Sequence, residues 1–117
     1  MASASIGILD HFNIRTRHLD ETVRFYRDIL GLTVGPRPNF SFPGAWMYSD
    51  GRAVVHLVDI ASTEEPQKPD SGAVHHVAFA SRGFAAMQQH LIMIVAEVGR
   101  GLNVHVAKQQ ARNCEGT

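Results

Sequence analysis

The sequence predicts an α+β fold built from small modules, in which one strand and one helix precede three further strands. A histidine-bearing strand near the N-terminus leads directly into an amphipathic helix. A hairpin signal, Asp50-Gly51, lies between two apolar runs. A short repeat supports a second module, because residues 9–14 (LDHFNI) are matched 65 residues later by residues 74–79 (VHHVAF).

The first module begins with an expected strand over residues 6–15. Alternation along this strand puts His11 and Asn13 on the same face. A helix is expected to follow, with Asp20 as its N-cap and with apolar residues at three- and four-residue steps. Gly31 stands where a left-handed residue would end this helix.

The rest of the first module is expected to be a loop and a hairpin. Residues 35–44 contain three prolines and are predicted to be mostly loop. Residues 45–48 form a short expected strand, and residues 53–60 form a longer one. Alternation puts His56 on the face of this last strand that is opposite to Leu57.

The second half of the chain repeats the order of strand and helix. A strand is expected over residues 73–80 and a helix over residues 84 to about 98. The predicted organisation is a first module over residues 1–60, a polar linker with two prolines over 61–72, and a divergent second module over 73–117. Together these parts are expected to form one domain.

The composition limits the possible functions. Eleven basic and eleven acidic side chains cancel, and no basic stripe points to nucleic acid. No apolar run is long enough for a transmembrane helix, and no signal peptide is apparent. Cys114 is the only cysteine, which excludes an intramolecular disulfide and favours a reducing compartment. We therefore expect a cytoplasmic protein with no membrane partner, and its small size favours a homodimer.

Four of the seven histidines lie on expected strands. If the strands line one concave sheet, His11, His56 and His76 point into the same cavity. Three neutral imidazoles suit a divalent transition metal such as Fe, Zn, Ni or Mn, and they leave positions open for substrate. Alternation predicts that His75 faces away from His76. The alternative for each strand histidine is a hydrogen-bonded structural role, which is the commoner one for a lone histidine.

The run LDHFNIRTRHLDETVRFYRDILGLTVGPR resembles the opening module of the vicinal oxygen chelate superfamily, which includes glyoxalases, bleomycin resistance proteins and extradiol dioxygenases. The run GAVHHVAFAS resembles the start of the second module. The resemblance implies two βαβββ modules whose curved mixed sheets surround a metal-binding cleft. Ligands would come from the first and last strands of each module, which correspond here to His11, His56 and His76.

The C-terminal part departs from the family pattern. Residues 91–117 show no recognisable strand with a glutamate ligand, and Glu115 has no context that marks it as one. The fourth ligand is therefore not assigned. The second module is expected to be incomplete, rearranged, or completed by an element exchanged with a partner chain.

The resemblance implies a metalloenzyme that binds a small molecule through two adjacent oxygens. The expected reaction is that of a metal-dependent lyase or isomerase, or of an extradiol-type dioxygenase. A non-catalytic protein that sequesters a ligand, like the bleomycin resistance proteins, is the alternative, and a remnant without activity is a third possibility. The residues expected to line the substrate pocket are Asn13, Arg15, Phe40, Trp46 and Tyr48.

Overall fold

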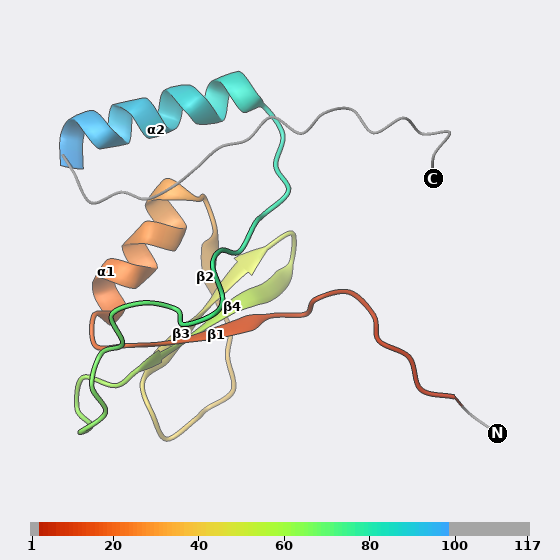
Figure 1. The fold of residues 1–117 in the computed structure, drawn as a ribbon, viewed down its shortest axis with the longest axis vertical. Helices are drawn as coiled ribbons and strands as arrows, with labels where there is room; N and C mark the ends of the chain where they lie inside the picture. Colours follow the sequence, from red (N-terminus) through yellow and green to blue (C-terminus); the bar gives the residue numbers. More distant parts are fainter. Residues whose placement is uncertain (1–2, 99–117) are drawn as a thin grey trace. The chain divides into compact units, whose positions relative to one another are not determined.

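The structure is a computed structural model that describes residues 3–98, and Figure 1 shows its ribbon. The chain divides into two compact units, Met1–Gly72 and Ala73–Thr117. The predicted module boundaries stay predictions.

The first unit contains a four-stranded mixed sheet. Its strands are β1 (Phe12–Thr16), β2 (Thr33–Gly35), β3 (Gly44–Ser49) and β4 (Arg52–Asp59). Their order across the sheet is β1-β4-β3-β2, so the first and last strands of the unit are neighbours. β1 runs parallel to β4, and the other pairs are antiparallel. Strands and helices together confirm the α+β class.

The helix of the first unit has two parts. It begins as α1 (Leu19–Arg24) and continues as the π-helix η1 (Phe25–Ile29). The N-cap is His18, so Asp20 lies in the first turn and not at the predicted cap. An acidic side chain there still interacts favourably with the helix dipole. Gly31 ends the helix with a φ of +79°, as predicted.

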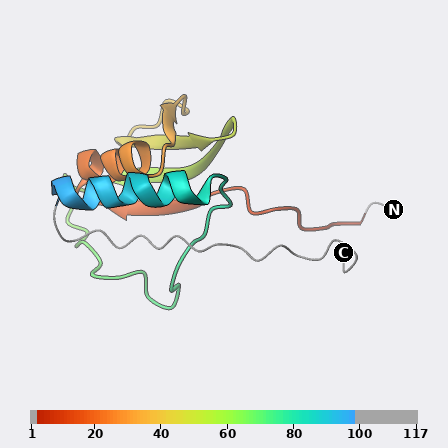
Figure 2. The same ribbon diagram turned by 90° about the horizontal axis from the view of Figure 1, so that it is seen from above.

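The core lies between this helix and one face of the sheet, as Figures 1 and 2 show. Met47 and Val55 are 0% exposed, and Leu57 is 1% exposed. Half-buried side chains of the helix, including Val23 and Tyr26, pack against this cluster. His56 alternates with Val55 and Leu57, so it lies on the opposite face of β4, as predicted.

The β3–β4 hairpin has the predicted turn. Asp50 and Gly51 both have positive φ values, 54° and 75°, as a two-residue type I′ turn requires. The strand β2 was not predicted, because three residues are too few to show alternation. Gly35, which was expected to begin the loop, is the last residue of β2. Residues 36–43 then connect β2 to β3 without regular structure.

Two arginines hold the segment that follows β4. The terminal nitrogens of Arg17 donate to four backbone carbonyls at 3.0–3.1 Å, those of Ile60, Ala61, Thr63 and Glu65. The Arg15 guanidinium donates to both carboxylate oxygens of Glu65, with the shortest distance at 2.7 Å. The predicted linker therefore begins as a fixed segment, although it has no regular secondary structure.

The described part of the second unit consists of an irregular segment and the helix α2 (Phe84–Val98). The helix agrees with the predicted one. The strand predicted over residues 73–80 is wrong, because the structure has no strand there. A strand needs a hydrogen-bonded neighbour, and residues 73–98 contain no other strand that could pair with it. A second βαβββ module is thus not seen in the described residues, while Cys114 and Glu115 lie outside them.

Candidate functional site

His11 and His56 meet on the sheet face that the helix of this unit does not cover. Their ring centroids are 3.7 Å apart and their planes differ by 11°, so the imidazoles are stacked. His56 lies within β4, whereas His11 lies one residue before β1 and not in the middle of a strand as predicted. The parallel pairing of Phe12 with Val55 brings the two histidines together. This juxtaposition agrees with the predicted common direction of the two imidazoles.

Trp46 stacks on the same imidazole. Its ring centroid is 3.9 Å from that of His56, with an angle of 12° between the planes. Trp46 lies directly opposite His56 in the register of β3 and β4. We call the three parallel rings of His11, His56 and Trp46 the ring row.

Each imidazole has one nitrogen next to a hydrogen-bond acceptor. His11 Nδ1 lies 2.6 Å from Asp10 Oδ2, and His56 Nε2 lies 3.1 Å from the Ala53 carbonyl. A nitrogen that faces an oxygen acceptor carries a proton, and in a neutral imidazole the other nitrogen then keeps its lone pair. Metal-binding histidines usually have this arrangement, with the second nitrogen donating to a carboxylate or a carbonyl.

The surroundings of His56 favour its neutral imidazole. Burial lowers the pKa of His56, and the neighbouring His11 lowers it further. The hydrogen bond with His11 lowers the pKa of Asp10, which therefore remains ionised. Arg52 lies 3.7 Å from the Asp10 carboxylate on its other side. A neutral imidazole next to an ionised carboxylate is the state that a metal ligand requires.

The ring row fits only part of a metal site. Among residues 3–98, no three His, Cys, Asp or Glu side chains are grouped so that they could hold a metal ion. His76 belongs to the second unit, where it lies in the exposed segment before α2. The prediction for His75 is wrong: its Nδ1 lies 2.9 Å from Nδ1 of His76, because this segment is not a strand and its side chains do not alternate. The set of His11, His56 and His76 stays a prediction.

The residues predicted to bind substrate have different surroundings. Asn13 is exposed on the face of the ring row. Arg15 follows on the same face, but its guanidinium already binds Glu65. Tyr48 donates from its hydroxyl to the Pro36 carbonyl, and Trp46 belongs to the ring row. That these residues bind a substrate stays a prediction.

Phe40 lies in an aromatic loop that sequence reasoning identified only in part. Its ring stacks with that of Phe42 at 4.9 Å between centroids, with 12° between the planes. The Arg37 guanidinium lies 5.0 Å and 5.4 Å from the two ring centroids. We call residues 36–43 the aromatic loop. Its F-x-F spacing was the signal that could have identified Phe42.

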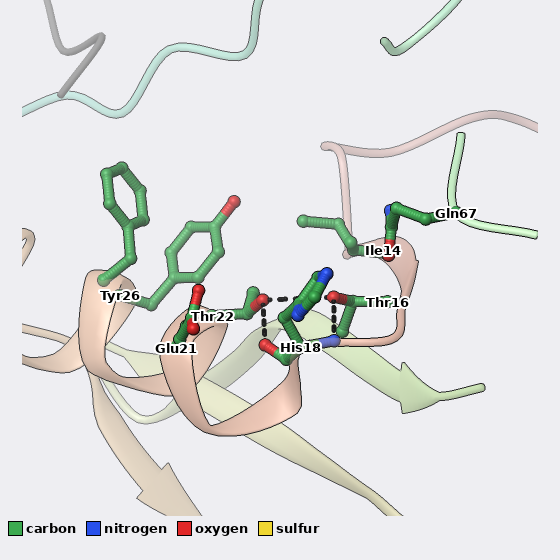
Figure 3. Close-up of a pocket in the computed structure, with 8 residues that line it drawn as sticks. Ile14, Thr16, His18, Glu21, Thr22, Tyr26 and Gln67 are labelled. Carbon is green, nitrogen blue, oxygen red and sulfur yellow. Dashed lines mark hydrogen bonds between the residues drawn. The ribbon is translucent and has the colours of Figure 1, made fainter. Parts of the chain in front are cut away.

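A separate hollow of about 430 Å³ opens on the helix side of β1, as Figure 3 shows. Thr16, His18 and Thr22 form a small hydrogen-bonded group in it. Burial raises the pKa of Tyr26 at the same place. The lining residues are Ile14, Thr16, His18, Glu21, Thr22, Phe25, Tyr26 and Gln67. Since Ile14 and Thr16 alternate with Asn13 and Arg15, this hollow and the ring row lie on opposite faces of β1.

This fold is compatible with the result of comparison with known proteins. The profile of the Glyoxalase/Bleomycin resistance protein/Dioxygenase superfamily matches residues 8–116, so the chain belongs to that superfamily. A relative from Arabidopsis thaliana, named Glyoxylase I 4, is 29% identical over 89 residues, which cover 71% of this chain and 49% of the relative. The chain thus spans about half the length of this curated relative. The predicted resemblance is confirmed.

One further expectation concerns membranes. Within the described residues, no helix is both long enough and apolar enough to cross a bilayer.

Proposed function

We propose that this chain is a glyoxalase-like metalloprotein that binds a small molecule through two adjacent oxygens, with His11 and His56 as metal ligands. The pair of imidazoles carries the proposal. Their ring centroids lie 3.7 Å apart, and each ring has one nitrogen next to an oxygen acceptor. Their stacked geometry is not itself a chelating one, since two ligand nitrogens must point at a common ion. We propose that one ring leaves the stack by turning about its side-chain bonds when the ion binds, while the hydrogen bond of the other ring holds that ring in place.

Fe, Zn, Ni and Mn all accept imidazole ligands, so the identity of the metal is left open within this group. When bound, such an ion supplies Lewis acidity toward a chelated oxygen. The chain's own contribution is to hold and orient the ligands: Asp10 and the Ala53 carbonyl fix the imidazoles. We propose His76 as the third ligand. The remaining ligands would come from residues outside the described part or from a partner chain in a homodimer.

The first experiment measures the metal. The full chain is purified without added metal, its transition-metal content is determined, and His11→Ala and His56→Ala are compared with His90→Ala, a histidine of α2. We expect a bound metal in the parent protein and in His90→Ala, and a loss of most of it in the other two variants. Equal metal content in all four proteins would contradict the assignment of the ligands.

The reaction is tested separately. A lyase or isomerase of this kind is expected to isomerise a glutathione hemithioacetal. An extradiol-type dioxygenase is expected to consume oxygen with a catechol when iron is present. Activity toward the first substrate that disappears in His56→Ala supports the glyoxalase-like reaction, whereas oxygen uptake alone selects the dioxygenase.

A non-catalytic, ligand-sequestering protein is the second candidate. The exposed rings of Phe40 and Phe42 near Trp46 favour it, because aromatic side chains bind ligands without any metal. Metal-free protein whose stability is unchanged in both histidine variants would support this candidate over the enzyme. For both candidates we propose a cytoplasmic homodimer, and sedimentation equilibrium tests its mass.

A further inference from the structure

We propose that Trp46 and the aromatic loop bind a flat aromatic group of the ligand, with Phe40 and Phe42 as its main contacts. This inference deepens the proposed function, and it rests on that function only in placing the ligand on the face of the ring row. It does not depend on which metal is bound, or on whether one is.

The ring row shows that this face favours parallel rings. The separations of 3.7 Å and 3.9 Å, with planes within 12° of parallel, are those of face-to-face contact. The strand register sets this spacing, because Trp46 and His56 are directly paired across β3 and β4. The indole is therefore held in place by its strand and by its neighbour before any ligand arrives.

The parallel series is interrupted beyond Trp46. The nearest ring of the aromatic loop, Phe40, is 6.4 Å from the indole by centroid and tilted by 52°, so the two rings do not stack. A ring inserted between them would need about twice the 3.9 Å separation that Trp46 keeps from His56. Entry of a flat group thus requires a small outward movement of the loop, after which the ligand ring would continue the series.

The aromatic loop keeps its rings available. Phe40 and Phe42 are 41% and 40% exposed, although they stack on each other. Arg37 fixes this arrangement by lying against both rings and by donating to the Phe42 carbonyl at 3.1 Å. Exposed apolar rings that are held in one geometry lose little entropy on binding, which is typical of contact residues in binding sites.

Gly35 and Tyr48 close the far side of this face. A Cβ on Gly35 would lie 2.5 Å from two ring carbons of Tyr48, so this phenol ring lies across the backbone of β2. The Tyr48 hydroxyl donates to the Pro36 carbonyl at the start of the aromatic loop. The loop is therefore attached to the sheet at its first residue.

The test compares two probes of the same charge and similar size, 2-naphthoate and its saturated analogue decahydro-2-naphthoate. Each is titrated into the full chain, which has been treated with a chelator to remove metal, and binding is measured by calorimetry. Trp46 is the only tryptophan in the sequence, so its indole N–H signal in an NMR spectrum reports where the probe binds. We expect 2-naphthoate to bind at least tenfold more tightly than the saturated probe and to shift the indole signal.

Variants locate the site. Phe40→Ala and Phe42→Ala are each expected to weaken binding of 2-naphthoate by about tenfold. Phe40→Tyr, which keeps a ring, is expected to bind like the parent. Phe25→Ala is the matched control, because Phe25 belongs to the same unit but lines the hollow on the opposite face of β1, and it is expected to change nothing.

Equal affinity for the two probes would overturn the proposal, as would a failure of 2-naphthoate to bind or an equal loss in Phe25→Ala. None of these results would change the metal content that we expect for the parent protein. Conversely, loss of metal in His11→Ala would leave naphthoate binding intact, so the two proposals fail independently.

Discussion

The two histidine-bearing segments, residues 9–14 and 74–79, have similar sequences but different structures. The first contributes β1, and its histidine stacks on His56. The second contains no strand, and Val77 and Phe79 remain 46% and 38% exposed. What separates them is a partner: β1 pairs with β4 over five residues, whereas the described part of the second unit offers no strand to pair with. An alternating pattern permits a strand, but a neighbouring strand with a buried face forms it.

The two segments should differ most in how much a substitution near them lowers the free energy of unfolding, and the core behind the first segment shows this best. Leu57 is 1% exposed, so Leu57→Ala leaves a cavity and should lower the free energy of unfolding by about 3 kcal/mol. Val77→Ala in the second segment should lower it by less than about 0.5 kcal/mol. Urea unfolding followed by circular dichroism measures both. A large effect of Val77→Ala would show that the second segment is packed.

A second difference concerns how closely β3 approaches β4. A Cβ on Gly44 would lie 2.2 Å from the Leu57 carbonyl oxygen, so Gly44→Ala must push the two strands apart. We expect a loss of about 2 kcal/mol in the free energy of unfolding. Gly7→Ala is the control, since nothing lies within 4 Å of its added carbon. Thermal unfolding distinguishes the variants, and equal melting temperatures would refute the tight strand contact.

Equivalent positions of the repeat give the most direct comparison. Ile14 packs against the core of the first unit, and Phe79 is its counterpart 65 residues later. Ile14→Ala should cost about 1–2 kcal/mol, because the side chain is only partly buried. Phe79→Ala should cost less, although it removes a larger side chain. If Phe79→Ala lowers the free energy of unfolding more than Ile14→Ala does in urea, the second segment is packed as well as the first, although it forms no strand.

The smallest effect concerns pH. The hydrogen bond from Arg15 lowers the pKa of Glu65 below its ordinary value of 4.5. The folded state thus binds this proton less readily than the unfolded state, and the pair contributes stability above about pH 4.5 that is lost as the pH falls through the lowered pKa. Glu65→Gln should remove this part of the pH dependence, and the neighbouring Glu64→Gln should keep it. Urea midpoints between pH 7 and pH 3 measure the difference.

Much of the first unit could be predicted from the sequence, because its signals are local. Asp50-Gly51 defines a turn by its own chemistry, and the alternation of Val55, His56 and Leu57 defines the two faces of β4. The parts that could not be predicted depend on pairing. The limits of β1 and the absence of a strand at residues 73–80 follow from which neighbours are present, and no local pattern contains that information.

The candidate site was predicted to a similar extent. The common direction of His11 and His56 follows from alternation once β1 and β4 are adjacent. The stacking of His56 between His11 and Trp46, the carboxylate of Asp10 and the Arg37-centred loop could not be inferred, because each depends on the rotamer of a side chain and on a contact set by the sheet register. The pairing of Arg15 with Glu65 crosses 50 residues, and the sequence carries no signal for it.

The way Arg17 is bonded has a bearing on which substitutions this chain tolerates. Its guanidinium is satisfied by four peptide oxygens, which every amino acid provides. These four contacts therefore do not depend on the side chains of residues 61–65, in contrast to the bond between Arg15 and the Glu65 carboxylate. A change of Glu65 would remove the Arg15 contact alone, whereas a change of Arg17 would remove all four backbone contacts of the segment at once.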